Sequence, residues 1–164
     1  LGGDGAKSVV YVIDCSGSMG KPIEKLGQAK RELIRSIRAL SPDQSFFVIF
    51  FRHNADPMPG GELLPATAGN KKMALDWIVG IEAYGGTNPM PALRQALALH
   101  PEAIYILSDG QFNAESPAEM KRQNHGFVRT TIYTVGFGSR VGEAQLTRLA
   151  EESGGTYRFV DAAH

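Results

Sequence analysis

Residues 9–18 read VVYVIDCSGS, and the interpretation of the whole chain starts from this stretch. An unbroken apolar run at positions 9–13 is typical of a β-strand that is buried on both faces, as in a parallel sheet. Asp14, Ser16 and Ser18 then follow at alternate positions, where the strand ends and a helix is expected to begin. A carboxylate and two hydroxyls on one tight loop are hard oxygen donors, which small hard cations such as Mg²⁺ prefer.

Further oxygen donors stand at two later places in the chain. The apolar run 104–107 is predicted to be a second buried strand, and Asp109 comes just after it. Between the two strands, Thr87 lies in a glycine-containing segment, residues 85–89, directly before an expected helix. Asp and Ser are also common helix N-caps, so any one of these residues could have that role alone. Taken together they favour a cation site, because carboxylates at the ends of apolar strands would otherwise be buried without compensation.

With these residues the chain resembles the von Willebrand factor type A (VWA) family and its metal-ion-dependent adhesion site (MIDAS). That site has the pattern D-x-S-x-S, then a loop Thr, then a strand-end Asp, and every position of it is filled here. The resemblance covers nearly the whole chain, including residues 146–157, which look like the family's last helix and strand. It implies that Mg²⁺, or Mn²⁺ or Ca²⁺ in its place, is held by Asp14, Ser16, Ser18, Thr87 and Asp109.

Strand and helix patterns alternate along the chain and predict an α/β fold. The Pro- and Gly-rich residues 54–61 are expected to be a loop, and residues 62–65 a short edge strand. Other strands are expected at 46–51, 131–135 and 156–160, and helices at 22–40, 73–81, 90–97, from about 117, and around 146–150. The resemblance implies a Rossmann-like three-layer αβα architecture. Its doubly wound, mostly parallel six-stranded sheet has the order 3-2-1-4-5-6 and a short antiparallel edge strand.

Composition narrows the classes of function. The chain has 164 residues, 43% of them hydrophobic, which fits one globular domain spanning residues 1–164. Its formal net charge is zero and no basic stripe is visible, so we expect no nucleic-acid partner. No apolar stretch approaches the roughly 18 residues of a membrane span, so we expect no insertion of this domain into a membrane. The single cysteine, Cys15, excludes an internal disulfide and is expected to fill space inside the metal loop.

The first residue is Leu1 rather than Met, and we expect the chain to be part of a longer protein. The compartment therefore stays open. An extracytoplasmic or membrane-anchored parent protein fits the sequence, and so does a cytoplasmic one.

The sequence favours a non-enzymatic, metal-dependent protein-interaction domain. By the resemblance, an open coordination position of the cation accepts an Asp or Glu carboxylate of a protein partner. The surrounding rim is expected to carry Lys21, Asn88, Gln111, Phe112 and Asn113.

Two other functions remain open, a metal-dependent hydrolase or phosphatase and an accessory module of a chelatase-like ATPase complex. Against a haloacid-dehalogenase-type phosphatase, Ser16 stands where that chemistry needs a second acid. His53 follows the strand 46–51 and is the catalytic candidate of the hydrolase alternative, although an exposed loop histidine is the commoner situation.

Overall fold

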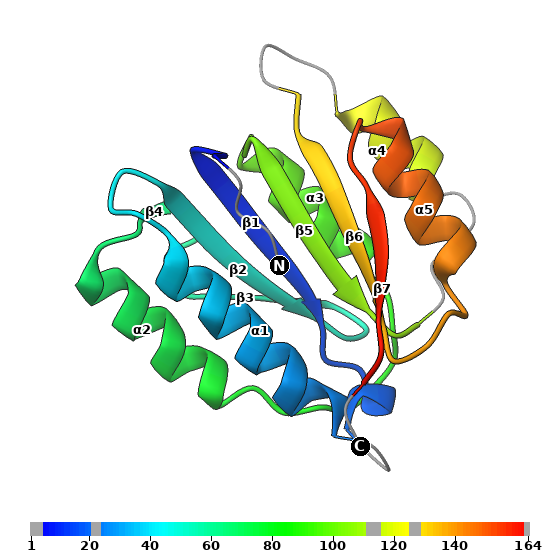
Figure 1. Ribbon diagram of the computed structural model, residues 1–164, viewed down its shortest axis with the longest axis horizontal. Helices are drawn as coiled ribbons and strands as arrows, with labels where there is room; N and C mark the ends of the chain where they lie inside the picture. The colour runs from blue at the N-terminus through cyan, green and yellow to red at the C-terminus, as the bar shows by residue number, and fades with distance from the viewer. Residues whose placement is uncertain (1–4, 21–23, 111–115, 125–128, 163–164) are drawn as a thin grey trace.

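A computed structural model describes residues 5–20, 24–110, 116–124 and 129–162 (Figure 1). Within these ranges, seven strands form one sheet with the order β3-β2-β1-β5-β6-β7, and β4 also pairs with β2. The strands are β1 (Ser8–Asp14), β2 (Ser45–Phe51), β3 (Ala55–Pro57), β4 (Leu64–Pro65), β5 (Ala103–Ser108), β6 (Thr131–Phe137) and β7 (Tyr157–Val160). β4 is the predicted antiparallel edge strand and pairs with β2, so the predicted doubly wound order 3-2-1-4-5-6 is confirmed, and β3 is an additional strand at the same edge.

The five central strands are parallel to one another, and β1 lies between β2 and β5. In register, Val12 of β1 stands beside Ile49 of β2 on one side and Ile106 of β5 on the other. From β1 the chain proceeds to β2, whereas from β5 it proceeds to β6 in the opposite direction across the sheet. The carboxyl ends of β1 and β5 therefore form the topological switch point, where open α/β sheets bind ligands.

Two short strands extend the β2 edge in the antiparallel direction. β4 pairs Leu64 with Phe46, which confirms the predicted edge strand near this position. The prediction that residues 54–61 form a loop was wrong in part, because β3 pairs Ala55 with Phe51. A tight turn after β2, with the Arg52 amide donating to the Asn54 carbonyl at 3.0 Å, folds this segment back onto the sheet. A proline is tolerated in each of these strands because they lie outside the parallel ladder.

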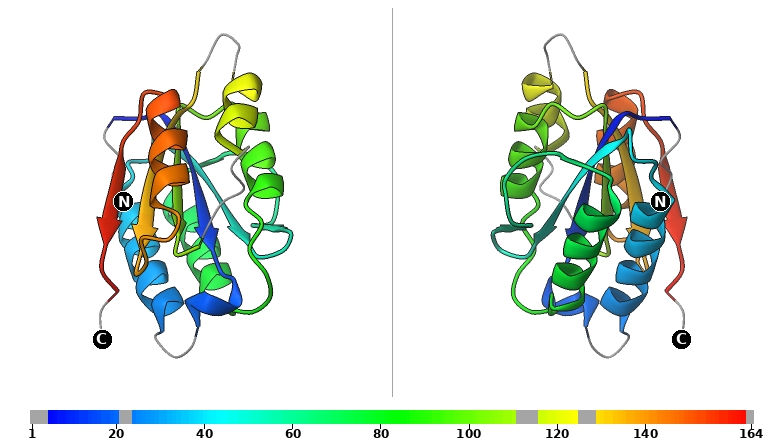
Figure 2. Two further views of the ribbon diagram at one scale, coloured as in Figure 1. Left: turned by 90° about the vertical axis from the view of Figure 1, so that its right-hand side faces the viewer. Right: turned by 90° about the vertical axis from the view of Figure 1, so that its left-hand side faces the viewer.

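Helices cover both faces of the sheet, giving the predicted three layers (Figures 1 and 2). On one face lie α1 (Lys25–Ala39) and α2 (Ala68–Val79), and on the other lie α3 (Met90–Ala98), α4 (Ser116–Gln123) and α5 (Glu143–Glu152). A 3₁₀ turn, η1 (Gly17–Met19), follows β1. The helix predicted from Pro22 begins at Lys25 in the described residues, and Pro22 and Ile23 lie outside them. Ile81 was predicted in a helix but follows the end of α2.

The core follows from the apolar runs of the central strands. Val9 to Ile13 of β1 have no exposed surface, and the side chains of β2 and β5 are also buried. Tyr11, Tyr105 and Tyr133 stack side by side across β1, β5 and β6, with ring centroids 6.1 and 4.8 Å apart. Burying one large apolar side chain stabilises a fold by about 1.5–3 kcal/mol, so these strands hold the carboxyl edge of the sheet firmly in place.

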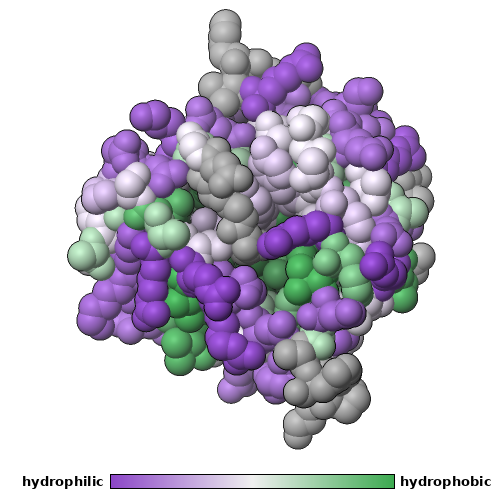
Figure 3. Space-filling model, in the orientation of Figure 1, coloured by the Kyte–Doolittle hydropathy of each residue, from purple (hydrophilic) through white to green (hydrophobic). Residues whose placement is uncertain are grey.

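The surface that carries α1 mixes polar and apolar side chains (Figure 3). A small hollow of about 140 Å³ lies between α1 and strands β5, β6 and β7, lined by both charged and apolar side chains, including Glu32, Arg158 and Phe137. No helix among the described residues is long and apolar enough to cross a membrane.

Candidate metal centre

Asp14 and Asp109 lie at neighbouring strand ends, as the predicted sheet order requires. Asp14 is the last residue of β1, and Asp109 directly follows β5. Asp14 has no exposed surface and Asp109 is 6% exposed. Both carboxylates therefore stand at the switch point, largely shielded from water.

A chain of hydrogen bonds joins the polar side chains at these strand ends. The Ser16 amide donates to Asp14 Oδ1 at 2.8 Å, and the hydroxyls of Ser16 and Ser18 are 3.3 Å apart. Ser18 Oγ in turn donates to Asp109 Oδ1 at 3.0 Å. On the other side, Ser108 Oγ donates to Asp14 Oδ2 at 2.7 Å. Four of the five predicted ligands thus belong to one continuous polar network.

Thr87, the fifth predicted ligand, lies beside this network on an exposed loop. A Cβ atom placed on Gly110 would lie 3.3 Å from Thr87 Cγ2, 3.7 Å from Ser108 Oγ and 3.8 Å from Asp14 Oδ2. Gly110 therefore marks a point on which the side chains of all three neighbouring segments converge. A larger residue there would fill the space between them.

Backbone hydrogen bonds fix the loop that carries Thr87 to the loop after β1 that carries Ser16 and Ser18. The Gly17 amide donates to the Gly85 carbonyl at 3.0 Å, and the Tyr84 amide donates to the Cys15 carbonyl at 3.1 Å. Gly85 has φ of 78°, a conformation that glycine adopts without the steric penalty of a Cβ atom. These bonds place Thr87 opposite the end of β1 although it is far from Asp14 in the sequence.

Sequence analysis did not single out Lys25 or Ser108, yet both contact the predicted carboxylates. Lys25 Nζ forms an ion pair with Asp109 Oδ2 at 2.8 Å, and Ser108 Oγ bonds Asp14. Ser108 could have been found, because its hydroxyl precedes the strand-end Asp109 and β5 pairs with β1. Lys25 carries no comparable signal, since the first residue of a helix does not reveal where its long side chain ends.

Electrostatics favour a cation at this edge of the sheet. Burial raises the pKa of Asp14 above its usual value, and hydrogen bonds from Ser16 and Ser108 offset this only in part. The negative charge of Asp109 raises the pKa of Asp14 further. A buried carboxylate whose charged form is disfavoured gains from a nearby positive charge.

The donor set fits a hard divalent cation better than a soft one. Its atoms are carboxylate and hydroxyl oxygens, which suit Mg²⁺, Mn²⁺ and Ca²⁺. In the described part of the chain, no group of three or more His, Cys, Asp or Glu side chains could hold a metal ion. A metal site here would therefore have two carboxylates and would take its other oxygens from hydroxyls and water. Burial raises the pKa of Cys15 to about 12, so its neutral thiol is no competing ligand.

Of the predicted rim around the network, only Asn88 lies within the described residues. Lys21 and residues 111–113 lie outside the described residues. Asn88 is engaged in the fold, because its Oδ1 accepts a hydrogen bond from the Met90 amide at 3.2 Å, at the start of α3. Met19, which adjoins the predicted rim, is fully buried.

The described residues also place His53, which the sequence analysis named, beside Arg52 and Tyr84, which it did not single out. The Arg52 guanidinium lies 4.0 Å above the ring of Tyr84, which is 59% exposed. His53 is exposed and close to the Thr87 loop, since a Cβ atom on Gly86 would lie 3.8 Å from His53 Nδ1. A cavity of about 390 Å³ borders these side chains.

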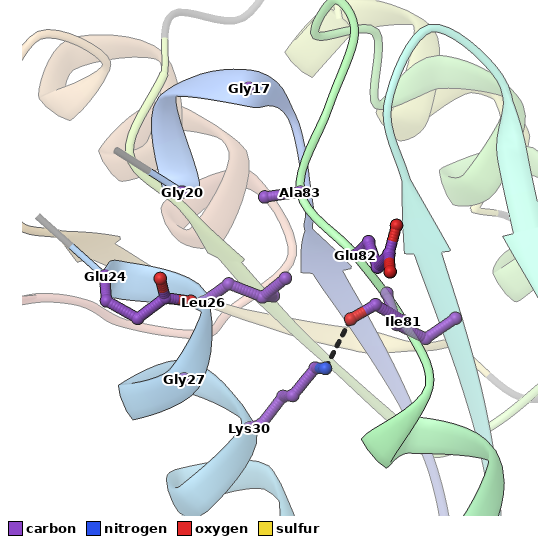
Figure 4. A pocket seen from close by; sticks show the side chains of 9 residues that line it. All are labelled: Gly17, Gly20, Glu24, Leu26, Gly27, Lys30, Ile81, Glu82 and Ala83. Carbon is purple, nitrogen blue, oxygen red and sulfur yellow. Dashed lines mark hydrogen bonds between the residues drawn. The ribbon is translucent and has the colours of Figure 1, made fainter. Parts of the chain in front are cut away.

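A second pocket, of about 450 Å³, is bordered by Gly17 and Gly20 of the loop that follows β1 (Figure 4). Lys30 projects into it from α1, and its ammonium donates to the carbonyls of Val79, at 3.1 Å, and Ile81. The lysine therefore binds the carbonyl end of α2 and anchors the segment that leads to Thr87. Because its ammonium is already engaged with the backbone, we assign this pocket a structural role.

Comparison with known proteins gives the family. A sequence profile described as von Willebrand factor type A domain matches residues 7–159. Inter-alpha-trypsin inhibitor heavy chain H4 of Homo sapiens is 34% identical over 171 residues, covering 94% of this chain and 18% of that protein. A von Willebrand factor A domain-containing protein of Dictyostelium discoideum is 28% identical, covering 92% of this chain and 18% of that protein. The chain thus spans less than a fifth of the length of these relatives.

Solved structures agree with the sequence comparison. The von Willebrand factor type A structure from Catenulispora acidiphila has a TM-score of 0.84 at 25% identity, over 94% of this chain and 38% of that one. A conserved hypothetical protein, BatB, from Bacteroides thetaiotaomicron has a TM-score of 0.72 at 18% identity, over 95% and 91% of the two chains, and supports the fold alone. Because the profile covers nearly all of the sequence, this chain belongs to the von Willebrand factor type A domain family.

Proposed function

We propose that this chain is a protein-interaction domain that binds a divalent cation and uses it to hold an acidic residue of a protein partner. The cation is Mg²⁺, or Mn²⁺ or Ca²⁺ in its place, and the domain itself is not an enzyme. The observation that supports this best is the hydrogen-bonded network that runs from buried Asp14 through Ser16 and Ser18 to Asp109, with Thr87 alongside. These five residues are the proposed ligands.

The chemistry of the ligands suits a site that is shared with a partner. Ser16, Ser18 and Thr87 are neutral, so only Asp14 and Asp109 offset the charge of a divalent cation. An octahedral ion that keeps several waters does not need all five oxygens in its inner shell. When bound, the cation would supply a positive charge that attracts a carboxylate from outside. Ser18 and Thr87 are exposed and so face the side from which a partner approaches.

The relatives support a protein partner. They include inter-alpha-trypsin inhibitor heavy chains, in which the matched domain makes up less than a fifth of the length. Next to the proposed metal site, the exposed Tyr84 ring offers aromatic surface for a peptide chain, and the buried Arg52 guanidinium, which pairs with Asp56, supports that ring from the protein side.

The test is the effect of the cation on thermal stability. A ligand that binds only the folded state raises stability by mass action, so millimolar Mg²⁺ or Mn²⁺ should raise the melting temperature. With a hundredfold excess over Kd, the gain in free energy of unfolding is about 2.7 kcal/mol. Asp14→Ala should lose the response, and so should Ser18→Ala, whose site is exposed. Asp76→Ala, on the exposed surface of α2, serves as the matched control that keeps it.

An equal rise in melting temperature for wild type and both site variants would remove these residues from consideration. A rise that is present in wild type and Asp76→Ala, and absent from Asp14→Ala and Ser18→Ala, would support the site. Calorimetric titration of the same variants with Mn²⁺ gives the stoichiometry, for which we expect one ion per chain.

The hydrolase alternative is supported only by the position of exposed His53 beside the Thr87 loop. It is separated from the interaction domain by assaying phosphate release from a set of phosphomonoesters. Metal-dependent release that is lost in both Asp14→Ala and His53→Ala would establish a hydrolase. A role in a chelatase-like ATPase complex would use the same site, and an ATPase domain next to this one in the parent protein would identify it.

A further inference from the structure

We propose that Lys25 is a resident counter-cation of the candidate metal centre, which holds Asp109 until a divalent cation displaces it and thereby lowers the affinity for that cation. This role rests on the metal binding proposed above. The Lys25 ammonium lies 2.8 Å from Asp109 Oδ2, while the other oxygen of the same carboxylate accepts the hydrogen bond from Ser18.

The ion pair of Lys25 and Asp109 is well shielded from solvent. Their side chains are 15% and 2% exposed, whereas those of Lys72 and Asp76, in the ion pair on α2, are 78% and 69% exposed. Exposed pairs are screened by water and salt, but a shielded pair keeps most of its electrostatic interaction. A cation that binds within this network would therefore repel the Lys25 ammonium with little screening by solvent.

The fold provides a path for the lysine side chain. A Cβ atom placed on Gly138 would lie 3.1 Å from Lys25 Cδ and Cε, closer than an ordinary contact. Gly138 also has φ of 71°, which side-chain-bearing residues rarely adopt. Gly138, which directly follows β6, therefore leaves the space through which the aliphatic part of Lys25 reaches Asp109.

Neither the helix dipole nor helix capping explains why a lysine stands at this position. Lys25 is the first residue of α1, where the positive end of the helix dipole disfavours a cation. Glu24 precedes it and forms no side-chain capping bond. The contact that favours the ammonium here is with Asp109, which belongs to the polar network rather than to the helix.

Charge balance then determines what happens when a divalent cation binds. Asp14 and Asp109 together carry two negative charges, and Lys25 balances one of them. A divalent cation would balance both, and the ammonium beside it would become an excess positive charge in a shielded place. Release of Lys25 from Asp109 removes this excess, so binding of the cation includes the cost of breaking the ion pair.

Lys25→Met tests this role, because methionine keeps an unbranched, apolar side chain and removes only the charge. We expect its Kd for Mn²⁺, measured calorimetrically, to be at least about tenfold lower than that of the wild type. A tenfold change corresponds to about 1.4 kcal/mol. Lys25→Arg keeps the charge and should remain within about threefold of the wild type. Lys72→Met controls for the loss of one positive charge elsewhere on the surface.

A second measurement needs no variant. In the wild type, acetic anhydride should acetylate Lys25 more extensively with saturating Mn²⁺ than in EDTA, as quantified by peptide mass spectrometry. Lys72 should be acetylated equally in both conditions. The acetylation experiment also decides the matter if Lys25→Met does not fold without metal.

The outcomes separate this role from the metal site itself. If the wild type binds Mn²⁺ and Lys25→Met binds it equally or more weakly, the metal site stands and the role of Lys25 is overturned. Unchanged acetylation of Lys25 in a wild type that binds Mn²⁺ overturns it in the same way. If neither the wild type nor Lys25→Met binds Mn²⁺, the site and the role of Lys25 both fall. Tighter binding by Lys25→Met, or by that variant alone, supports the displacement.

Discussion

Asp14 is the residue of the candidate metal centre whose negative charge is most costly to bury. Its carboxylate has no exposed surface, and the groups that donate to it, the Ser16 amide and the Ser108 hydroxyl, are both neutral. The positive charge of Lys25 contacts Asp109 instead. Without a bound cation, the charged form of Asp14 is thus disfavoured, and this has a measurable effect on stability.

Asp14→Asn should stabilise the metal-free protein at pH 7 by roughly 1 kcal/mol, because it removes a buried charge while keeping the shape of the side chain. The raised pKa means that the folded state binds more protons than the unfolded state between the two pKa values. The free energy of unfolding of the wild type therefore falls as pH rises from about 4 through the folded pKa. Urea unfolding in EDTA from pH 4 to pH 8 measures this difference.

Below about pH 4 Asp14 is protonated in both states, and the advantage of Asp14→Asn should vanish. Asp76→Asn, an exposed carboxylate on α2, is the control and should show no such gain. A wild type that is more stable than Asp14→Asn by a constant amount across this pH range would contradict the expected cost.

At the level of single residues, the sequence predicted the oxygen donors better than their surroundings. Asp14, Ser16, Ser18 and Asp109 meet because they follow strands that are adjacent in the sheet, and the strand runs are visible in the sequence. The contact of Lys25 with Asp109 depends on a helix start, a glycine at the end of β6 and a flexible side chain. No periodicity in the sequence encodes such a combination.

Two lysines tie α1 and α2 together at opposite ends. Lys30, near the start of α1, donates to the Val79 and Ile81 carbonyls at the end of α2. Lys71, near the start of α2, donates to the Arg38 and Leu40 carbonyls at the end of α1. Each lysine thus satisfies carbonyls that the last turn of a helix leaves without intrahelical partners. The two contacts are chemically alike, but only the end of α2 continues toward Thr87.

Lys30→Met and Lys71→Met should therefore lower the free energy of unfolding by similar amounts, about 1–2 kcal/mol each. Only Lys30→Met should also weaken the Mg²⁺-induced rise in melting temperature, because it frees the segment that positions Thr87. Chemical denaturation gives the first quantity and thermal melts with and without Mg²⁺ give the second. Equal metal responses in the two variants would show that anchoring of residues 79–83 does not contribute to the site.

The elements themselves were predictable to different degrees. The central strands were found because their apolar runs are short and rich in β-branched and aromatic residues, which favours buried strands over helices. β3 was missed because its proline and polar neighbours resemble a loop, and its pairing with β2 depends on the turn at Arg52. Only the structure shows why position 155 requires a glycine, because a Cβ atom there would lie 2.0 Å from the Ile132 carbonyl oxygen.

At the scale of the whole molecule, formal charges cancel, with 17 basic and 17 acidic residues. A protein without net charge exerts little long-range attraction on a charged partner, so recognition depends on local groups. The proposed local groups are the cation with its oxygen ligands and the exposed ring of Tyr84 beside it. This arrangement makes a definite demand on the partner, because the bond to the cation requires a carboxylate.

Peptides with a single central Glu should therefore bind the domain in millimolar Mn²⁺, and the same peptides with Gln at that position should not. A carboxylate bound to a cation forms a charge-assisted contact that an uncharged amide cannot replace, which is worth about 1.5–3 kcal/mol or roughly 10- to 150-fold in affinity. Fluorescence anisotropy over a varied peptide library, with EDTA added at the end, measures both the Glu requirement and the release.

Ser18→Ala and Tyr84→Ala separate the two parts of the surface in this assay. Ser18→Ala should reduce the affinity of every Glu peptide, because it removes an oxygen ligand that all of them depend on. Tyr84→Ala should reduce affinity in a sequence-dependent way, because the exposed ring contacts the residues that flank the Glu. Binding that persists in EDTA, or that does not distinguish Glu from Gln, would place the partner on another surface of the domain and leave the metal centre without a role in recognition.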